Sequence, residues 1–169
     1  LLRPFAERLV VARHAESRIE RAIEKDGSVK DDASPELRRL RRELRGAEGE
    51  LVRLLERLMA RLEPHQRVAD MSVTVRNGRY VIPIRREARG AVGGIVHDQS
   101  ATRGTLFVEP PAAVEAGNRI RELEADERQE VERVLAELTD ELRPLREAMI
   151  DSLDVLAMLD SLYARAGFA

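Results

Sequence analysis

Apolar residues recur at every third or fourth position from Leu37 to Leu62, and few folds other than a long helix tolerate such a run. The spacing is typical of the apolar seam of a coiled coil. Ser34 supplies an N-cap just before it, Pro35 suits the first helical position, and Pro64 stops the run. The pattern predicts a helix over residues 34–63, roughly 45 Å long at 1.5 Å per residue.

A second helical repeat of matching length occupies residues 111–143, and Pro144 is expected to kink or split it. A last helix carries Met149 to Leu162 before Gly167. At the other end of the chain, residues 2–24 also show helical spacing, beginning with Leu2, and this spacing predicts one amphipathic helix that stops near Asp26 and Gly27.

Between the two long repeats the apolar period changes from about 3.6 to 2. Residues 71–76 and 79–84 alternate around Asn77-Gly78, a strong hairpin signal that predicts Arg76 opposite Arg79, one apolar face and one polar face. Residues 94–100 and 104–109 form a second pair of strand-like runs around a short loop at 101–103.

The fold class is therefore mainly α with a small β insert, in which long antiparallel helices bear a four-stranded module at their far end. The alternative is a globular α+β domain with a folded-back sheet. The expected segments are residues 1–70 (first helices), 71–109 (strand module) and 110–169 (return and closing helices).

Composition excludes several function classes. The chain has no cysteine, which rules out disulfide scaffolds and cysteine-based zinc sites. Lysine occurs only at Lys25 and Lys30, so a phosphate loop ending in Gly-Lys-Ser/Thr is absent and any ATP would bind elsewhere. No apolar run approaches a membrane span. The chain starts at Leu1, and we expect a piece of a longer cytoplasmic protein.

The basic residues gather in the middle of the chain. Residues 71–106 hold six basic and two acidic residues, a net charge of +4, within a chain whose net charge is -2. Such a patch suggests a localised anionic partner. Arg76 and Arg79 would repel each other, no acidic residue lies close in sequence, and a phosphate would relieve the repulsion. The predicted nucleic-acid contacts are Arg76, Asn77, Arg79, Arg85, Arg86, Arg89 and Arg103. The competing interpretation is that these arginines are merely solvated.

Base reading and catalysis are not expected. Tyr80 falls on the apolar face and Phe107 in the core, so stacking platforms are missing and backbone contact is the expected mode. His97 and Asp98 are neighbours on a strand and point to opposite faces, which rules out a triad with Ser100. No metal cluster is indicated, and the fragment should have no enzymatic activity.

Several strings together resemble the second bacterial branch of the MutS family. They are residues 73–84 (VTVRNGRYVIPI), 94–100 (GIVHDQS), 105–110 (TLFVEP), 33–37 (ASPEL) and 164–169 (ARAGFA), with Asp160. The resemblance covers nearly the entire chain. It departs at residues 101–104 (ATRG), where the family usually has a Ser/Gly-rich turn.

The resemblance implies the core and lever region of such a protein with its inserted clamp, the part that reaches around DNA. It also implies an ATPase using ATP and Mg²⁺ and a small MutS-related nuclease domain, both outside this chain, and a homodimer. The family is associated with suppression of homologous recombination through branched DNA such as Holliday junctions and D-loops, and in some bacteria with stalled or collided ribosomes. A third interpretation is a structural coiled-coil spacer with protein contacts.

Overall fold

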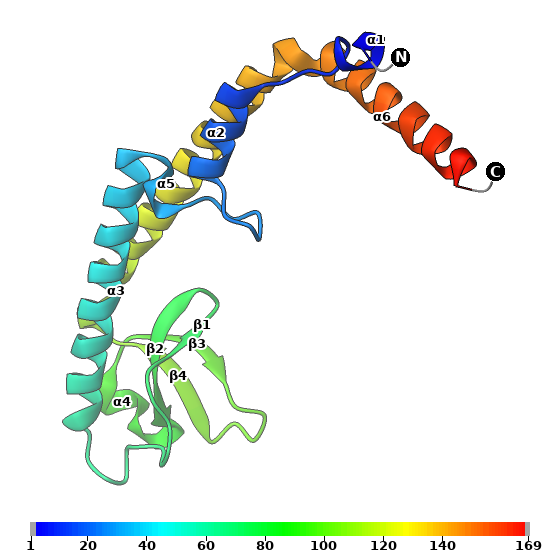
Figure 1. Ribbon diagram of the computed structural model, residues 1–169. Helices are drawn as coiled ribbons and strands as arrows, with labels where there is room; N and C mark the ends of the chain where they lie inside the picture. The colour runs from blue at the N-terminus through cyan, green and yellow to red at the C-terminus, as the bar shows by residue number, and fades with distance from the viewer. Residues whose placement is uncertain (1–2, 168–169) are drawn as a thin grey trace. The chain divides into compact units, whose positions relative to one another are not determined.

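A computed structural model describes residues 3–167 of the chain (Figure 1). The predicted start of the first helix at Leu2 and the last two residues of the final string lie outside them. Contacts divide the chain into two compact units. The strand unit is Arg39–Arg128, and the helical unit joins the first 38 residues to the chain from Gln129 onward. The helices α3 (Pro35–Ala60) and α5 (Pro111–Leu142) contribute to both units, and both match the predicted long helices.

The strand unit contains the four predicted strands, in one antiparallel sheet of order β1-β2-β4-β3. They are β1 (Thr74–Arg76), β2 (Arg79–Arg85), β3 (Ile95–Gln99) and β4 (Thr105–Glu109). The short helices η2 (Arg86–Ala88) and α4 (Arg89–Val92) connect β2 to β3. One face of the sheet packs Ile82, Ile84 and Val108 against Leu51 and Leu55 of α3 and against the start of α5.

The turn between β1 and β2 has the predicted geometry. Asn77 has φ 52° and Gly78 has φ 70°, as a two-residue hairpin turn requires. Arg76 stands opposite Arg79, confirming the register. A Cβ added at Gly78 would lie 2.7 Å from a guanidinium nitrogen of Arg121, so the turn lies against the end of that side chain, which extends from α5.

The second face of the sheet is not polar, and that prediction was wrong. Val81 and Pro83, expected among the polar alternation, are buried together with Phe107. Arg76 on one edge strand reaches Asp98 on the other edge strand, which requires the sheet to curl. The curl turns this face inward, so β2 is buried on both sides.

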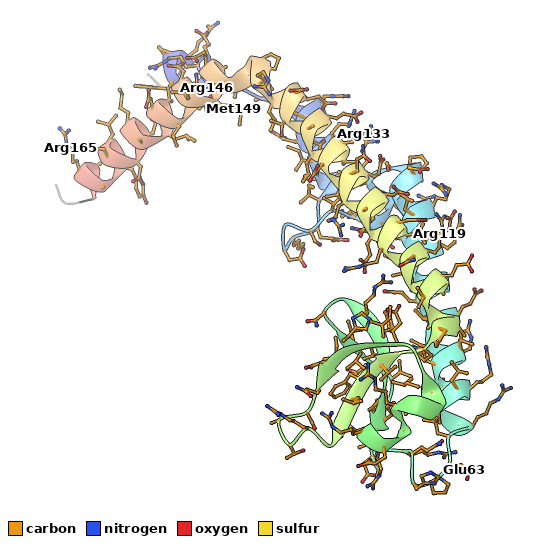
Figure 2. All side chains as sticks on the ribbon, turned by 180° about the vertical axis from the view of Figure 1, so that it is seen from behind. Glu63, Arg119, Arg133, Arg146, Met149 and Arg165 are labelled. Carbon is orange, nitrogen blue, oxygen red and sulfur yellow. The ribbon has the colours of Figure 1, made fainter. Side chains whose placement is uncertain are left out.

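The helical unit contains α1 (Arg3–Ala6), α2 (Arg13–Ala22), η1 (Asp31–Ala33) and the first turn of α3, with the rest of α5, η3 (Arg143–Leu145) and α6 (Arg146–Ala166). Its core packs Ala22 and Val29 with Leu37, Val134 and Leu138. The break in helix at Arg143–Leu145 falls where Pro144 was predicted to kink or split it. The side chains of α6 project outward along most of its length, from Met149 to Arg165 (Figure 2).

The single helix predicted over residues 2–24 is instead α1 and α2 with a non-helical stretch between them. The N–H of Val10 donates to the hydroxyl of Ser152 on α6 at 2.8 Å. The same hydroxyl lies 2.8 Å from the carbonyl of Ala148 in α6 and 3.3 Å from the carbonyl of Arg8, either of which can accept its proton. Arg8 also pairs with Asp151. These contacts satisfy main-chain groups that a helix would have bonded internally, so tertiary contacts override the local periodicity.

Within residues 3–167, no helix is both long enough and apolar enough to span a membrane.

Candidate nucleic-acid interface

The seven predicted contact residues fall into separate groups because β2 lies between them. The turn end holds Arg76, Asn77 and Arg79. The loop end, where β2 stops and β3 turns into β4, holds Arg85, Arg86 and Arg103. Seven residues of strand separate the two ends by roughly 20 Å. Arg89 begins α4 beyond the loop end.

Arg76 at the turn end is held within the sheet. Its Nε lies 3.2 Å from Asp98 on β3, and its guanidinium carbon lies 4.4 Å from the centre of the Phe107 ring. The same side chain donates to the hydroxyl of Thr74 and to the carbonyl of Val75. It covers a buried aromatic ring and closes the curled sheet, and its charge is partly compensated.

Arg79 at the turn end meets a buried carboxylate. A guanidinium nitrogen lies 3.4 Å from Glu109, whose side chain is only 2% exposed, and another donates to Asn118 on α5 at 2.6 Å. Glu109 also lies 2.7 Å from His97. A Cβ at Gly117 would approach both Glu109 and Arg79 within 3 Å, so a glycine in α5 leaves room for this contact.

Asn77 joins the turn to the far edge of the sheet. β3 has a bulge at His97, since Val96 faces Val108 while Asp98 faces Phe107. The bulge leaves the carbonyl of His97 outside the ladder, and the Asn77 amide donates to it at 2.8 Å. The turn end is thus a network of structural contacts.

No acidic residue lies close in sequence to the Arg76–Arg79 pair, as expected, but the fold brings Asp98 and Glu109 to the pair from β3 and β4. Reasoning from the sequence missed these partners, and Asn118 and Gly117 as well, because all of them lie far from the turn along the chain. One signal was available: Glu109 ends an otherwise apolar strand, and a carboxylate in such a place needs a partner.

Arg85 and Arg86 at the loop end have no carboxylate partner among residues 3–167. Arg85 donates through Nε to the carbonyl of Arg67 at 3.0 Å. Arg86 donates through Nε to the carbonyl of Arg103 at 2.6 Å and through a second nitrogen to Gln99 at 2.9 Å. Neither guanidinium group is therefore neutralised by a carboxylate, and both hold neighbouring segments of the chain in place.

Arg89 and Arg103 are exposed, and within the described part of the chain their guanidinium groups have no ion-pair or hydrogen-bond partner. Arg103 has φ 59°, a conformation that few residues other than glycine adopt readily. Its N–H donates to the carbonyl of Ser100, and the Thr105 N–H donates to the Ser100 hydroxyl, which closes the loop.

The structure agrees with the rejection of a catalytic triad. His97 contacts Glu109, Asp98 contacts Arg76, and the Ser100 hydroxyl accepts from the Thr105 N–H.

Tyr80 is half-buried in the helix-facing core, as predicted. Burial raises its pKa to about 12, helped by the hydrogen bond that its hydroxyl donates to Glu48. Among residues 3–167, no group of three or more side chains is arranged to hold a metal ion.

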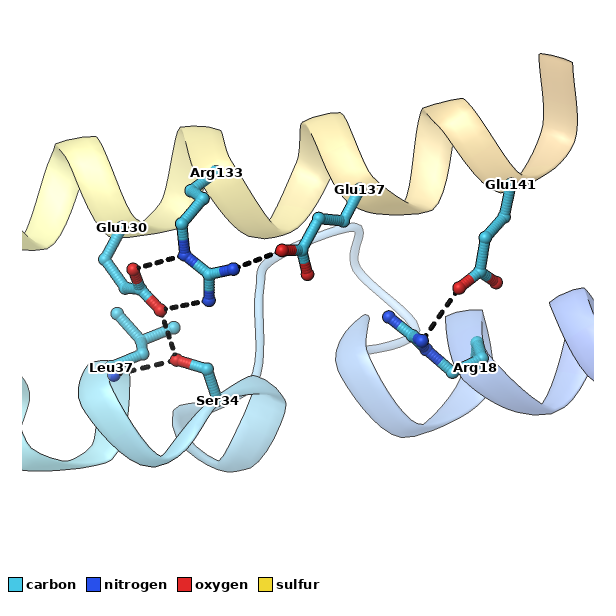
Figure 3. Close-up of polar contacts among 7 residues, drawn as sticks. All are labelled: Arg18, Ser34, Leu37, Glu130, Arg133, Glu137 and Glu141. Atoms are coloured by element: carbon cyan, nitrogen blue, oxygen red, sulfur yellow. Dashed lines mark hydrogen bonds and ion pairs between the residues drawn. The ribbon is translucent and has the colours of Figure 1, made fainter.

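A polar node in the helical unit joins α3 to α5 (Figure 3). Ser34 caps α3 by accepting from the Leu37 N–H at 2.9 Å, and it donates to buried Glu130 at 2.6 Å. Arg133 donates twice to the same carboxylate and also pairs with Glu137. The Arg133 hydrogen bonds, with that of Ser34, lower the pKa of Glu130 from 4.5 to about 2.

The strand unit therefore combines a curled four-stranded sheet with parts of α3 and α5, and Arg85, Arg86 and Arg103, at one end of that sheet, have no carboxylate partner among residues 3–167. No family model matches the chain. It is 63% identical over 165 residues to the endonuclease MutS2 of Gemmatimonas aurantiaca, 42% to that of a Geobacillus species and 44% over 168 residues to that of Halalkalibacterium halodurans. These matches cover 98–99% of this chain but only 20–21% of each relative. The chain therefore belongs to the MutS2 family, which confirms the resemblance found in the sequence.

Proposed function

We propose that the strand module, residues 74–109, binds nucleic acid through its phosphate backbone and acts as a clamp on a lever formed by α3 and α5. The observation that carries this proposal is the loop end, where Arg85, Arg86 and Arg103 hold three positive charges with no carboxylate partner among the described residues. Planar guanidinium groups suit phosphate because each donates two hydrogen bonds at once.

Backbone contact is favoured over base reading. Phe107 is buried beneath Arg76, and Tyr80 is held by Glu48, so the strands offer no free ring for stacking. The relatives' name, endonuclease, denotes an activity on nucleic acid, which supports the same class of ligand.

The proposed ligand is branched DNA, such as a Holliday junction or a D-loop, engaged by a longer cytoplasmic, homodimeric protein that suppresses homologous recombination. ATP hydrolysis with Mg²⁺ and nuclease cleavage would belong to other parts of that protein, and this region would bind without catalysing. A ribosome carries the same phosphate chemistry and is the competing target.

The test is a salt titration of the chain against a four-way DNA junction, a linear duplex of equal length and purified ribosomes. We expect the logarithm of affinity to fall linearly with the logarithm of salt concentration, with junction bound tighter than duplex. Tighter ribosome binding would move the function to the competing target. Binding to none of the three would refute nucleic-acid recognition and favour a structural spacer.

A further inference from the structure

We propose that the phosphate-contacting element of the strand module is the loop of residues 100–104 with Arg103 and the adjacent Arg85, and that Arg76 and Arg79 are structural. This inference rests on the proposed nucleic-acid function and divides the seven predicted residues by what their charged groups already contact.

The turn-end arginines are already occupied. Arg76 is shared between Asp98 and the Phe107 ring. Arg79 donates to Asn118, and its other terminal nitrogen is buried 3.4 Å from Glu109 without forming a hydrogen bond. A phosphate at either position would have to displace a carboxylate, and at Arg79 that carboxylate is buried. Drawing Arg79 away would leave the buried Glu109 carboxylate with His97 alone, which is costly, so phosphate gains little there.

The loop is built to present Arg103. Arg86, directly after β2, fixes this loop in place. Its main-chain N–H donates to the carbonyl of Gly104 at 3.0 Å, and its side chain donates to the carbonyl of Arg103. The Ser100 hydroxyl braces the other side through the Thr105 N–H at 3.1 Å. The guanidinium of Arg103 therefore extends into solvent from a backbone with few ways to move.

The loop also offers neutral donors beside that charge. The main-chain N–H groups of Ala101, Thr102 and Gly104 have no partner among residues 3–167, and all three residues are exposed. The Thr102 hydroxyl shares one contact, with Ser100 at 3.3 Å. Main-chain amides and hydroxyls of this kind commonly accompany arginine at phosphate oxygens.

Arg85 extends the same surface. It stands opposite Thr105 in the ladder, so it lies at the strand end from which the loop begins. Among residues 3–167, the Nε of its side chain donates to the carbonyl of Arg67 and its terminal nitrogens have no partner, which leaves them to donate elsewhere. Arg85 and Arg103 therefore place two positive charges at the same end of the sheet.

The left-handed conformation at Arg103 allows a substitution that separates binding from folding. Arg103→Gly removes the charge and relieves the backbone strain, so it should leave the melting temperature unchanged or raise it. Arg103→Lys keeps the charge and should retain most of the binding.

The experiment measures binding of the whole chain to a 30-base-pair DNA duplex and to the same sequence as RNA duplex, by fluorescence anisotropy over a range of salt. We expect Arg85→Gln/Arg103→Gly to weaken binding roughly 10- to 100-fold and to reduce the salt slope by about two. Arg76→Gln/Arg79→Gln should lower the melting temperature and leave the slope unchanged.

A matched control removes the same charge elsewhere. Arg57 and Arg128 lie on α3 and α5, are exposed, and have no partner in the described part of the chain. Arg57→Gln/Arg128→Gln should keep the wild-type salt slope.

The inference is overturned if Arg85→Gln/Arg103→Gly keeps the wild-type salt slope, or if Arg76→Gln/Arg79→Gln reduces it while the chain stays folded. A wild-type chain with no salt-dependent binding would instead refute the proposed function itself. Equal losses on DNA and RNA would place recognition in the shared backbone, and a loss on only one would overturn the phosphate assignment.

Discussion

The node between Ser34, Glu130 and Arg133 makes a quantitative prediction about stability. Ser34→Ala removes the cap of α3, which costs about 1 kcal/mol. It also removes a 2.6 Å hydrogen bond to a buried carboxylate, worth about 1.5 kcal/mol or more because the acceptor is charged. We expect Ser34→Ala to lower the free energy of unfolding by about 2–3 kcal/mol at neutral pH.

The pH dependence of the same node follows from Glu130. Its pKa is about 2 in the folded chain and 4.5 ordinarily, so the folded state favours the ionised form. Its contribution is present above pH 4.5 and is lost as pH falls through about 2. A shift of this size corresponds to roughly 3 kcal/mol, but the Arg133 side chain is 48% exposed, and solvent screening reduces our expectation to about 2 kcal/mol.

The assay is urea unfolding followed by circular dichroism between pH 7 and pH 2.5. Glu130→Gln should be less stable than wild type by about 2 kcal/mol at pH 7, and most of that difference should vanish between pH 4.5 and 2.5. Glu132→Gln is the matched control, because Glu132 is exposed on the same helix and has no partner among residues 3–167.

A double-mutant cycle tests the coupling directly. Ser34→Ala and Glu130→Gln together should cost about 1 kcal/mol less than their sum, since each removes the same hydrogen bond. Additive losses, or a pH profile for Glu130→Gln that runs parallel to that of Glu132→Gln, would refute the reasoning.

Three further predictions concern the strand unit, each measured as the free energy of urea unfolding. Gly117→Ala should destabilise the fold by about 1–3 kcal/mol although alanine favours helix, because the added Cβ would lie 2.8 Å from a buried carboxylate oxygen. Gly46→Ala, whose Cβ would have nothing within 4 Å, is the control and should stabilise by up to about 1 kcal/mol. Equal effects of the two substitutions would contradict this prediction. Leu55→Ala should cost about 2–5 kcal/mol as a fully buried truncation, and a loss under 1 kcal/mol would show a loosely packed seam. Arg76→Gln should cost about 1 kcal/mol by uncovering the Phe107 ring. A gain in stability would instead show that repulsion between Arg76 and Arg79 outweighs these contacts.

Local chemistry explains what the sequence predicted correctly. The three-and-four spacing after Ser34-Pro35 indicated α3, and the period of two around Asn77-Gly78 indicated β1 and β2 in the correct register. Each of these signals depends on residues within one helical turn or one hairpin, where backbone preference and side-chain period act without distant help.

The site residues were proposed from composition, and whether they bind nucleic acid stays a prediction. Charge counting singled out the basic module, and Arg85, Arg86 and Arg103 at its loop end are exposed. The sequence could not tell Arg76 from Arg103, because the difference lies in Asp98 and Phe107, which reach Arg76 only through the curl of the sheet.

Amino-acid order by itself determined the two long helices, the four strands and the register of the hairpin between β1 and β2, because those depend on neighbours in sequence. Tertiary structure decided which charges are neutralised, why β2 is buried on both faces, and why the first helix breaks where Val10 bonds Ser152, 142 residues away. The physical reason is the same in each case: burial and hydrogen bonding are satisfied between segments far apart in the chain, and no local pattern records which segments will meet.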